Sequence, residues 1–182
     1  MRHGETEWSA AGRHTGSTDV PLTSAGRAAA KRIGQLVASQ SFATVFTSPL
    51  GRARETCELA GLSGGAVIDD DLREWDYGDY EGLTTAEIRE TRPDWTVWRD
   101  GCPNGEVAAD VGARVDRVVA RLRERDGMLA VFGHGHCLRV LAARWVGLVA
   151  EDGARIALDT ATVSRLGWER EQPVLRTWNV QP

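Results

Sequence analysis

Two histidines and two arginines stand where they could act together on a phosphoryl group. His3 follows Arg2 almost at the start of the chain. Arg52 comes shortly after one apolar run, and His134 lies between two glycines after a second. Arginine carries a planar, permanent positive charge that matches phosphate oxygens, and a neutral imidazole can attack phosphorus through its lone pair. These residues therefore indicate phosphoryl transfer with electrostatic stabilisation of the transferred group.

A glutamate adds a candidate proton donor to this set. Glu74 lies in segment 72–83, which is rich in Gly, Asp and Tyr and is expected to be a loop. A carboxylic acid can protonate the leaving oxygen and later activate water. Because Glu74 must then carry a proton when substrate binds, we expect a mildly acidic pH optimum. Glu81 and Asp76 are alternatives for this role, whereas Glu5 is more readily explained as structural.

Strand-like runs alternate with helical patterns along the chain. We expect strands near 42–47, 66–68, 128–132, 162–168 and 174–180. We expect helices near 24–40, 49–61, 84–92 and 107–122, and one carrying residues 138–145. This alternation predicts an α/β fold, with an open, mostly parallel sheet and helices on both faces in a three-layer sandwich. Ligands of such sheets gather at the carboxyl ends of the strands, so His3, Arg52 and His134 should meet at one rim.

Helical spacing also predicts which side chains are buried. In the helix that begins with Ser24 as its cap, the expected buried face is Ala25, Ala29, Ile33 and Leu36. In the helix over 107–122, the expected buried face is Val107, Val111, Val115, Val118 and Leu122. Glu106 is expected to cap that second helix. Residues 1–22 are polar and carry turn formers, so they are expected to form a long loop without regular structure.

The bulk composition narrows the class of protein. The 182 residues suit one domain, 1–182, and 42% hydrophobic with 26% charged residues is ordinary for a globular protein. A net charge of −4 argues against nucleic-acid binding, and no apolar run has the length of a membrane span. The three cysteines form no CxxC pair and no signal peptide is visible, so we expect a reduced, cytoplasmic protein.

Taken together, the motifs resemble a known family. The chain is similar over nearly its whole length to the histidine phosphatase (phosphoglycerate-mutase-like) superfamily, on the evidence of segments 2–6, 48–56, 72–82 and 133–136. Within it, bacterial broad-specificity acid phosphatases and fungal sugar-bisphosphate phosphatases such as sedoheptulose-1,7-bisphosphatase resemble the chain most closely in segments 12–16, 74–78 and 98–103.

The resemblance assigns a role to each of the five residues. It makes His3 the nucleophile that forms a phosphohistidine, with a backbone carbonyl holding its other nitrogen, and it makes Glu74 the proton donor. Arg2, Arg52 and His134 would then bind the phosphoryl group. Further substrate-binding residues are expected to be Thr15, Gly16, Tyr77, Arg99, Gly135 and His136. Candidates of lower rank for the pocket are His14, Trp75, Trp98 and Arg139. The resemblance implies no metal, no cofactor and, by analogy alone, a homodimer.

Three readings of the activity are kept open. Phosphoglycerate mutases place a lysine near Thr85 and paired arginines where this chain has Arg99 and Asp100. Fewer cations retain a bisphosphate less well, so we expect a phosphatase that acts on small phosphomonoesters, sugar phosphates among them. A mutase is the second reading, and a phospho-ligand binding module with little turnover is the third. Segment 84–105 is expected to be an insertion that covers the site.

Two structural alternatives also follow from the sequence. In the resembled family the Arg-His-Gly triplet ends a central strand, whereas here only Met1 precedes it. Either the numbering starts inside a longer protein or the sheet lacks that strand, and the support for His3 depends on which is true. His134, His136 and Cys137 could also be metal ligands, although adjacent residues at 136 and 137 rarely both reach one ion.

Overall fold

The centre of the molecule is a parallel sheet. A computed structural model describes all of residues 1–182. Three strands pair in parallel in the order β2 (Val67–Ile68), β1 (Thr44–Thr47) and β3 (Leu129–Phe132). Alternate residues of β3 face opposite sides, because Ala130 and Phe132 belong to one hydrophobic cluster while Leu129 and Val131 pack against the other. The sheet is therefore buried on both faces.

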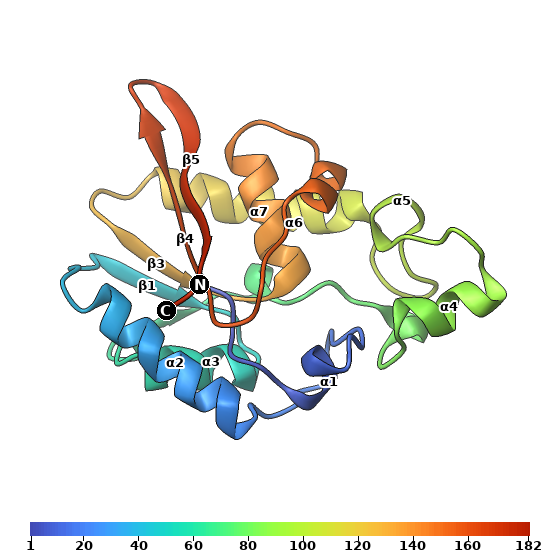
Figure 1. The fold of residues 1–182 in the computed structure, drawn as a ribbon. Helices are drawn as coiled ribbons and strands as arrows, with labels where there is room; N and C mark the ends of the chain where they lie inside the picture. The colour runs from blue at the N-terminus through green and yellow to red at the C-terminus, as the bar shows by residue number, and fades with distance from the viewer.

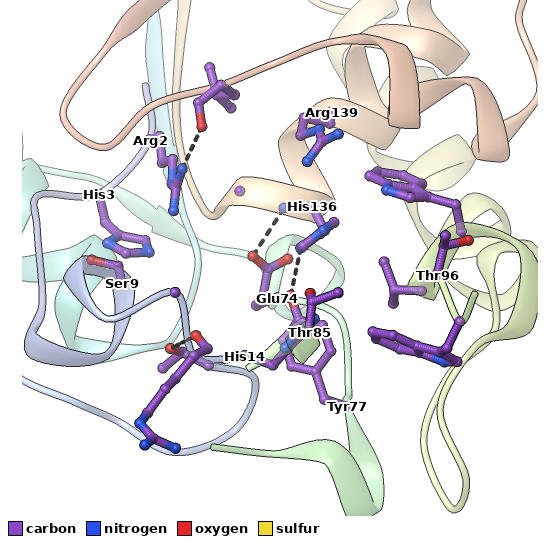
Figure 2. Close-up of a pocket in the computed structure, with 18 of the residues that line it drawn as sticks. Arg2, His3, Ser9, His14, Glu74, Tyr77, Thr85, Thr96, His136 and Arg139 are labelled. Carbon is purple, nitrogen blue, oxygen red and sulfur yellow. Dashed lines mark hydrogen bonds between the residues drawn. The ribbon is translucent and has the colours of Figure 1, made fainter. Parts of the chain in front are cut away.

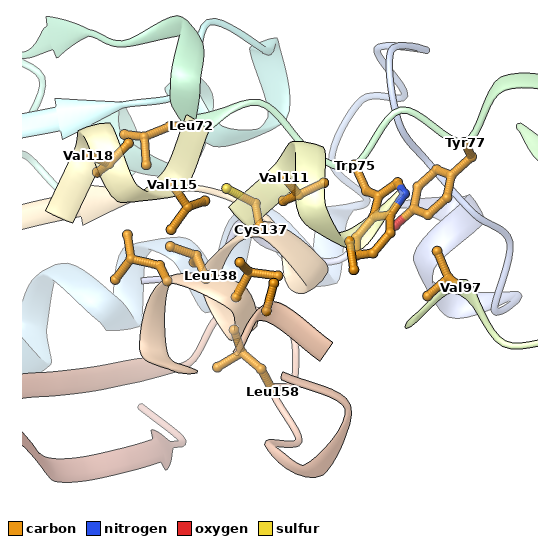
Figure 3. Close-up of a cluster of buried hydrophobic side chains, with 14 of the residues drawn as sticks. Leu72, Trp75, Tyr77, Val97, Val111, Val115, Val118, Cys137, Leu138 and Leu158 are labelled. Carbon is orange, nitrogen blue, oxygen red and sulfur yellow. The ribbon is translucent and has the colours of Figure 1, made fainter. Parts of the chain in front are cut away.

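Helices cover both faces of this sheet. On one side lie α2 (Ser24–Val37) and α3 (Gly51–Leu59), and on the other lie α6 (Ala108–Arg123) and α7 (Gly135–Trp145) (Figure 1). The predicted α/β architecture, a parallel sheet between two helical layers, is confirmed. The larger cluster, between the sheet, α6 and α7, contains Leu72, Val111, Val115, Val118, Cys137 and Leu138 (Figure 3).

The buried face of α2 differs from the predicted one. The cap is Thr23, whose side chain accepts a hydrogen bond from the Gly26 N–H. The buried positions are Gly26, Ala30, Ile33 and Val37, and Leu36 is 45% exposed. The reason is close packing on the N-terminal segment, since a Cβ added at Gly26 would lie 2.2 Å from the Glu5 carbonyl oxygen. Only glycine fits there, and this contact sets the rotation of the helix.

The start of α6 also corrects two predictions. Val107 precedes the helix and is 45% exposed, while the other four predicted apolar positions are buried. Asp110, rather than Glu106, caps the helix, because its carboxylate accepts a hydrogen bond from the Val107 N–H at 3.0 Å. The Glu106 carboxylate instead forms an ion pair with Arg114.

One short helix lies in a segment that was expected to be irregular, and two more lie in the covering segment. Within residues 1–22, α1 (Glu7–Ala10) begins at a reciprocal capping box between Thr6 and Ser9. A helix of four residues is too short to show an apolar period, so the sequence pattern could not reveal it. In the covering segment, α4 (Thr85–Thr91) has the predicted capping box of Thr84 and Glu87, and α5 (Val97–Asp100) follows. Both lie beyond the end of the sheet (Figure 1).

The remaining elements hold the two ends of the chain. Met1 to His3 runs parallel to β3, because the Met1 ammonium donates to Val131 and the His3 N–H donates to Gly133 at 3.0 Å. His3 is thus placed at the carboxyl end of the sheet. The antiparallel hairpin of β4 (Val163–Glu169) and β5 (Gln172–Val180) forms a separate two-stranded sheet. The short 3₁₀ turns are η1 (Asp70–Leu72), η2 (Gly78–Tyr80) and η3 (Ala150–Arg155). No helix has the length and apolarity needed to cross a membrane.

Candidate active site

His3 has the geometry of a nucleophile. Its Nδ1 lies 2.7 Å from the Gly4 carbonyl oxygen. Because a carbonyl can only accept, Nδ1 must carry the proton, which leaves the lone pair on Nε2. The ring is 4% exposed, and burial, reinforced by the charges of Arg2 and Arg52, lowers the pKa of His3 well below its ordinary value. His3 is therefore a neutral imidazole with a reactive nitrogen at mildly acidic and neutral pH.

Two arginines are held beside His3 by backbone carbonyls. Arg2 Nη1 donates to the Leu158 carbonyl oxygen. Arg52 donates to the carbonyl oxygens of Thr15 and Gly16, each at 2.9 Å, and to that of Thr18 at 3.0 Å. The Nε of each arginine is buried and has no partner in the protein. Buried donors of this kind are normally satisfied, so both guanidinium groups can still donate to a bound anion.

His134 contributes a third such donor. Its ring centroid lies 5.2 Å from that of His3. Ser48 Oγ accepts from the Leu50 N–H, and the only acceptor within reach of its own proton is His134 Nε2 at 2.7 Å, so the hydroxyl donates to Nε2. The proton of the ring is then on Nδ1, which is buried without a partner. Burial, and after it the charge of Arg52, lowers the pKa of His134 well below its ordinary value, so it donates as a neutral imidazole.

Glu74 is held at the N-terminus of α7. Its Oε1 accepts from the N–H groups of Trp75 and Cys137, both at 2.9 Å, and its Oε2 accepts from the His136 N–H at 3.0 Å. The residue is 8% exposed. Helix N-termini orient and stabilise carboxylates in this way. Glu74 is the only acidic residue that lines the cavity beside His3.

This cavity has a volume of about 360 Å³ and extends from His3 to the covering segment. Arg2 and His3 lie at one end, Thr96 lies at the other, and Glu74 and His136 lie between them (Figure 2). The wall between the two ends is built from His14, Tyr77, Trp95, Trp98, His136 and Arg139. A cavity with His3 and buried donors at one end, the Glu74 carboxyl group next along it, and space beyond can hold a phosphate ester with a sizeable organic group.

Hydrogen bonds within the protein hold the side chains of this wall in place. His14 Nδ1 donates to the Leu83 carbonyl oxygen at 2.8 Å, and Tyr77 Oη lies 2.7 Å from His136 Nδ1. Burial lowers the pKa of His14, and lowers that of His136 well below its ordinary value. Arg139 lies over the Trp98 ring, 4.6 Å from its centroid. The wall therefore combines uncharged imidazoles with one guanidinium group.

These buried neutral histidines predict a pH-dependent stability. The pKa values of His3, His134 and His136 are lowered in the fold, so between those values and about pH 6.5 the unfolded chain binds protons that the folded chain does not. The free energy of unfolding should thus fall as the pH drops below about 6.5, by about 1.4 kcal/mol per pH unit for each such histidine. Above about pH 6.5, these histidines should leave the free energy of unfolding unchanged.

Urea unfolding at several pH values measures this effect. Carboxylates also destabilise proteins in acid, so the informative quantity is the difference between the wild type and His136→Asn. The slope between about pH 6 and pH 5 should be shallower in the variant by about 1.4 kcal/mol per unit. Equal slopes in the two proteins would show that His136 is not a buried neutral group.

Comparison with known proteins agrees with this geometry. The family sequence model of the histidine phosphatase superfamily (branch 1) matches residues 1–181 of this chain. The chain belongs to the histidine phosphatase superfamily. The predicted resemblance is therefore confirmed, and the match extends over nearly the whole chain.

The relatives of this histidine phosphatase superfamily member include named phosphatases. An acid phosphatase of Mycobacterium tuberculosis is 46% identical over 175 residues, which cover 93% of this chain and 85% of the relative. A sedoheptulose 1,7-bisphosphatase of Saccharomyces cerevisiae is 42% identical over 180 residues, which cover 81% of this chain and 66% of the relative. A solved structure of an open reading frame product from Mycobacterium tuberculosis has a TM-score of 0.95 at 43% identity, covering 99% of this chain and 95% of that one.

The structure brings most of the predicted site residues of this superfamily member together. Arg2, His3, Thr15, Glu74, Tyr77, Gly135 and His136 all line the cavity. Arg52, His134 and Gly16 lie buried behind them. Arg99 does not reach the cavity, because its guanidinium pairs with Asp100 at 2.8 Å and donates to the Asp94 carbonyl oxygen at 2.7 Å. In the single turn of α5, Trp98 faces the cavity and Arg99 faces solvent.

The alternative acids and metal ligands have other contacts. The Glu81 carboxylate accepts from the N–H groups of Gly16 and Thr18 and so holds the loop that anchors Arg52. Glu5 accepts from the Thr23 hydroxyl, as a structural residue would. Asp76 accepts from the Gly78 N–H. No group of His, Cys, Asp or Glu side chains, including the predicted alternative of His134, His136 and Cys137, is arranged to hold a metal ion.

Several residues of the site were missed by sequence reasoning. Ser9, Arg13, Thr85, Arg89 and Thr96 line the cavity, and Ser48 sets the tautomer of His134. Ser48 directly follows β1, at the strand end where ligands gather, so its position offered a signal. The others come from loops and short helices, whose inward faces cannot be read from spacing.

Proposed function

We propose that this chain is a phosphatase that hydrolyses small phosphomonoesters, sugar phosphates among them, through a phosphohistidine on His3. The observation that carries the proposal is the pairing of His3 with unsatisfied donors. The Nε2 of His3 bears a lone pair, and the neighbouring Arg2, Arg52 and His134 each have a buried nitrogen without a protein partner. The names of the relatives, an acid phosphatase and a sugar bisphosphatase, support hydrolysis.

In the first step, His3 Nε2 forms a bond to phosphorus while the bond from phosphorus to the ester oxygen breaks. The electron pair of the broken bond stays on that oxygen, and Glu74 gives it a proton, so a neutral alcohol leaves. Arg2, Arg52 and the Nδ1–H of His134 stabilise the negative charge on the phosphoryl oxygens.

In the second step, water attacks the phosphorus of phosphohistidine. Glu74, now a carboxylate, takes one proton from the water, and the electrons of the phosphorus–nitrogen bond return to His3 Nε2. Inorganic phosphate leaves, and both His3 and Glu74 recover their starting states. The buried, neutral form of His3 suits it both as a nucleophile and as a leaving group.

Water rather than a second alcohol is the expected acceptor. Thr85, near which mutases carry a lysine, lines the cavity, and Arg99 is turned to solvent. The cations with which mutases retain a bisphosphate for return transfer are therefore missing at these two positions, although Arg2, Arg13, Arg89 and Arg139 line the cavity. The mutase remains the second candidate on the strength of the shared superfamily.

A release assay on a panel of phosphate esters tests this proposal. The panel is p-nitrophenyl phosphate, 3-phosphoglycerate, fructose 1,6-bisphosphate and sedoheptulose 1,7-bisphosphate, each with wild type and with His3→Ala. Phosphate released from several esters by the wild type alone supports the phosphatase. Isomerisation of 3-phosphoglycerate with little free phosphate would make the protein a mutase, and binding without either reaction would make it a binding module.

Arg139 predicts a preference for substrates with a second anionic group. It lines the cavity, donates to the carbonyl oxygens of Gly153 and Ala154, and forms no ion pair with a carboxylate. Burial lowers the pKa of Arg139; the nearby Glu74 carboxylate opposes this effect, and the charge of Arg2 adds to it. A guanidinium so placed can bind a phosphate or carboxylate at the organic end of the substrate.

Replacing Arg139 by methionine should therefore change specificity. The kcat/KM for a sugar bisphosphate should fall about tenfold to hundredfold, because a hydrogen bond to a charged group contributes about 1.5–3 kcal/mol. The kcat/KM for p-nitrophenyl phosphate should fall much less. Arg144→Met is the matched control, since Arg144 lies on the same helix but pairs with Asp116 at the surface. Equal losses on the two substrates would contradict a role in specificity.

A further inference from the structure

Arg114 of α6 makes an unusually complete set of contacts with the loop that carries Glu74. The side chain of Arg114 is 11% exposed. Its Nη1 donates to the carbonyl oxygens of Asp71 at 2.8 Å and Arg73 at 2.7 Å, and its Nη2 donates to that of Glu74 at 3.1 Å. Its Nε and Nη2 also form a bidentate ion pair with Glu106, at 2.7 and 2.9 Å. One guanidinium thus binds three backbone carbonyls of a segment that has no strand or helix of its own at Arg73 and Glu74.

Glu106 forms hydrogen bonds with the residues that follow Glu74 in the loop. Its Oε2 accepts from the Asp76 N–H at 2.8 Å, and its backbone N–H donates to the Asp76 carbonyl oxygen at 2.9 Å. Its carbonyl oxygen accepts from Trp75 Nε1 at 2.9 Å. The loop is therefore bound before, at and after Glu74 by one ion pair. Neither Arg114 nor Glu106 lines the cavity. The one polar contact of the Arg114 side chain with α7 is that of its Nη1 with Cys137 Sγ, at 3.6 Å.

We propose that the Arg114–Glu106 pair is a positioning device for the proton donor Glu74. The proposal rests on the proposed function, in which Glu74 protonates the leaving oxygen. Proton transfer requires the carboxyl group within hydrogen-bond reach of that oxygen. The α7 N-terminus orients the Glu74 carboxylate, whereas Arg114 and Glu106 set the backbone from which it projects. Lysine cannot replace Arg114, because an ammonium lacks the planar fork that binds Glu106 and the carbonyls at once.

The dependence of rate on the leaving group tests this role. Departure of a sugar alcohol needs a proton, whereas 2,4-dinitrophenolate is stable enough to leave without one. A displaced acid therefore slows only the first kind of substrate. The quantity to compare is kcat/KM, which covers the steps up to departure of the alcohol and leaves out hydrolysis of the phosphohistidine.

For Arg114→Met, we expect kcat/KM for a sugar phosphate to fall about tenfold to hundredfold, a part of the 10²–10⁴-fold that general acid catalysis supplies. The loss with 2,4-dinitrophenyl phosphate should be within about threefold, since transfer of the phosphoryl group is positioned by other residues. Arg114→Lys should resemble Arg114→Met. Arg117→Met is the matched control, because Arg117 lies on the same helix and pairs with the Asp71 side chain, yet binds none of these carbonyls.

The outcomes separate this proposal from the proposed function. Equal losses of Arg114→Met on both substrates, or no loss on either, would overturn the positioning role. If Arg114→Met does not fold, Glu106→Gln takes its place with the same expected selectivity, and a uniform loss there overturns the proposal equally. Glu74→Gln is measured alongside: if it too shows no preference for the better leaving group, the assignment of Glu74 as the acid is wrong, and the proposed mechanism fails with it.

Discussion

Replacing His3 by alanine is expected to abolish turnover of every substrate. The imidazole supplies the only bond that the protein makes to phosphorus in the proposed mechanism, and no other histidine combines a carbonyl-held Nδ1 with a place among the buried donors of Arg2, Arg52 and His134. Removal of a covalent catalyst that acts as part of a unit lowers kcat on the order of 10⁴-fold or more. His3→Ala should do the same here.

The measurement is a rapid quench with a ³²P-labelled ester in alkaline detergent, where phosphohistidine survives. Wild type should carry label that acid later removes, and His3→Ala should carry none. Because His3 is buried, the urea unfolding of the variant is measured too, so that loss of the fold is not mistaken for loss of the nucleophile. A folded His3→Ala protein with near wild-type rate would refute the mechanism.

Replacing Arg52 by methionine should be the second most damaging change. In the proposed mechanism Arg52 has two functions: its buried Nε, which has no partner in the protein, donates to the phosphoryl group, and its Nη groups hold the loop of Thr15, Gly16 and Thr18. Loss of one preorganised donor to developing negative charge lowers kcat by about 10²–10³-fold. Arg52→Lys should recover little of this loss, because an ammonium cannot bind several carbonyls in one plane.

The neighbouring residue Arg54 provides the control. It lies two positions along on α3, where its side chain is exposed and forms no hydrogen bond. Steady-state rates with p-nitrophenyl phosphate for Arg52→Met and Arg54→Met should therefore differ by about 10²-fold or more. Similar rates for the two variants would mean that Arg52 does not stabilise the transferred phosphoryl group.

The layout of the sheet and the place of the candidate site residues on it could be predicted from local patterns. Runs such as 128–132 are apolar throughout, as buried parallel strands are, and the alternation of strands and helices restricts the topology to a few arrangements. A strand end then fixes where a following residue lies. His134 and Arg52 were placed at one rim on that basis alone.

Side-chain directions within short or closely packed elements could not be predicted. On α2, the spacing of Ala25, Ala29 and Leu36 favoured one face, yet the contact of Gly26 with the Glu5 backbone turned the helix so that Leu36 is exposed. Arg99 was expected at the substrate, yet the turn of α5 directs it to Asp100 and solvent. In both cases a contact between residues of different elements outweighed the local pattern.

By itself, then, the sequence determined which chemical groups are available and at which end of the sheet they lie, because residue type and apolar period are local properties. Only the tertiary structure decided that the lone pair of His3 is on Nε2, that Glu74 is the acidic side chain lining the cavity, and that Arg114 binds the loop that carries it. These depend on hydrogen bonds, whose strength changes steeply over tenths of an ångström and a few tens of degrees. Such precision arises only when elements far apart in the chain have packed together.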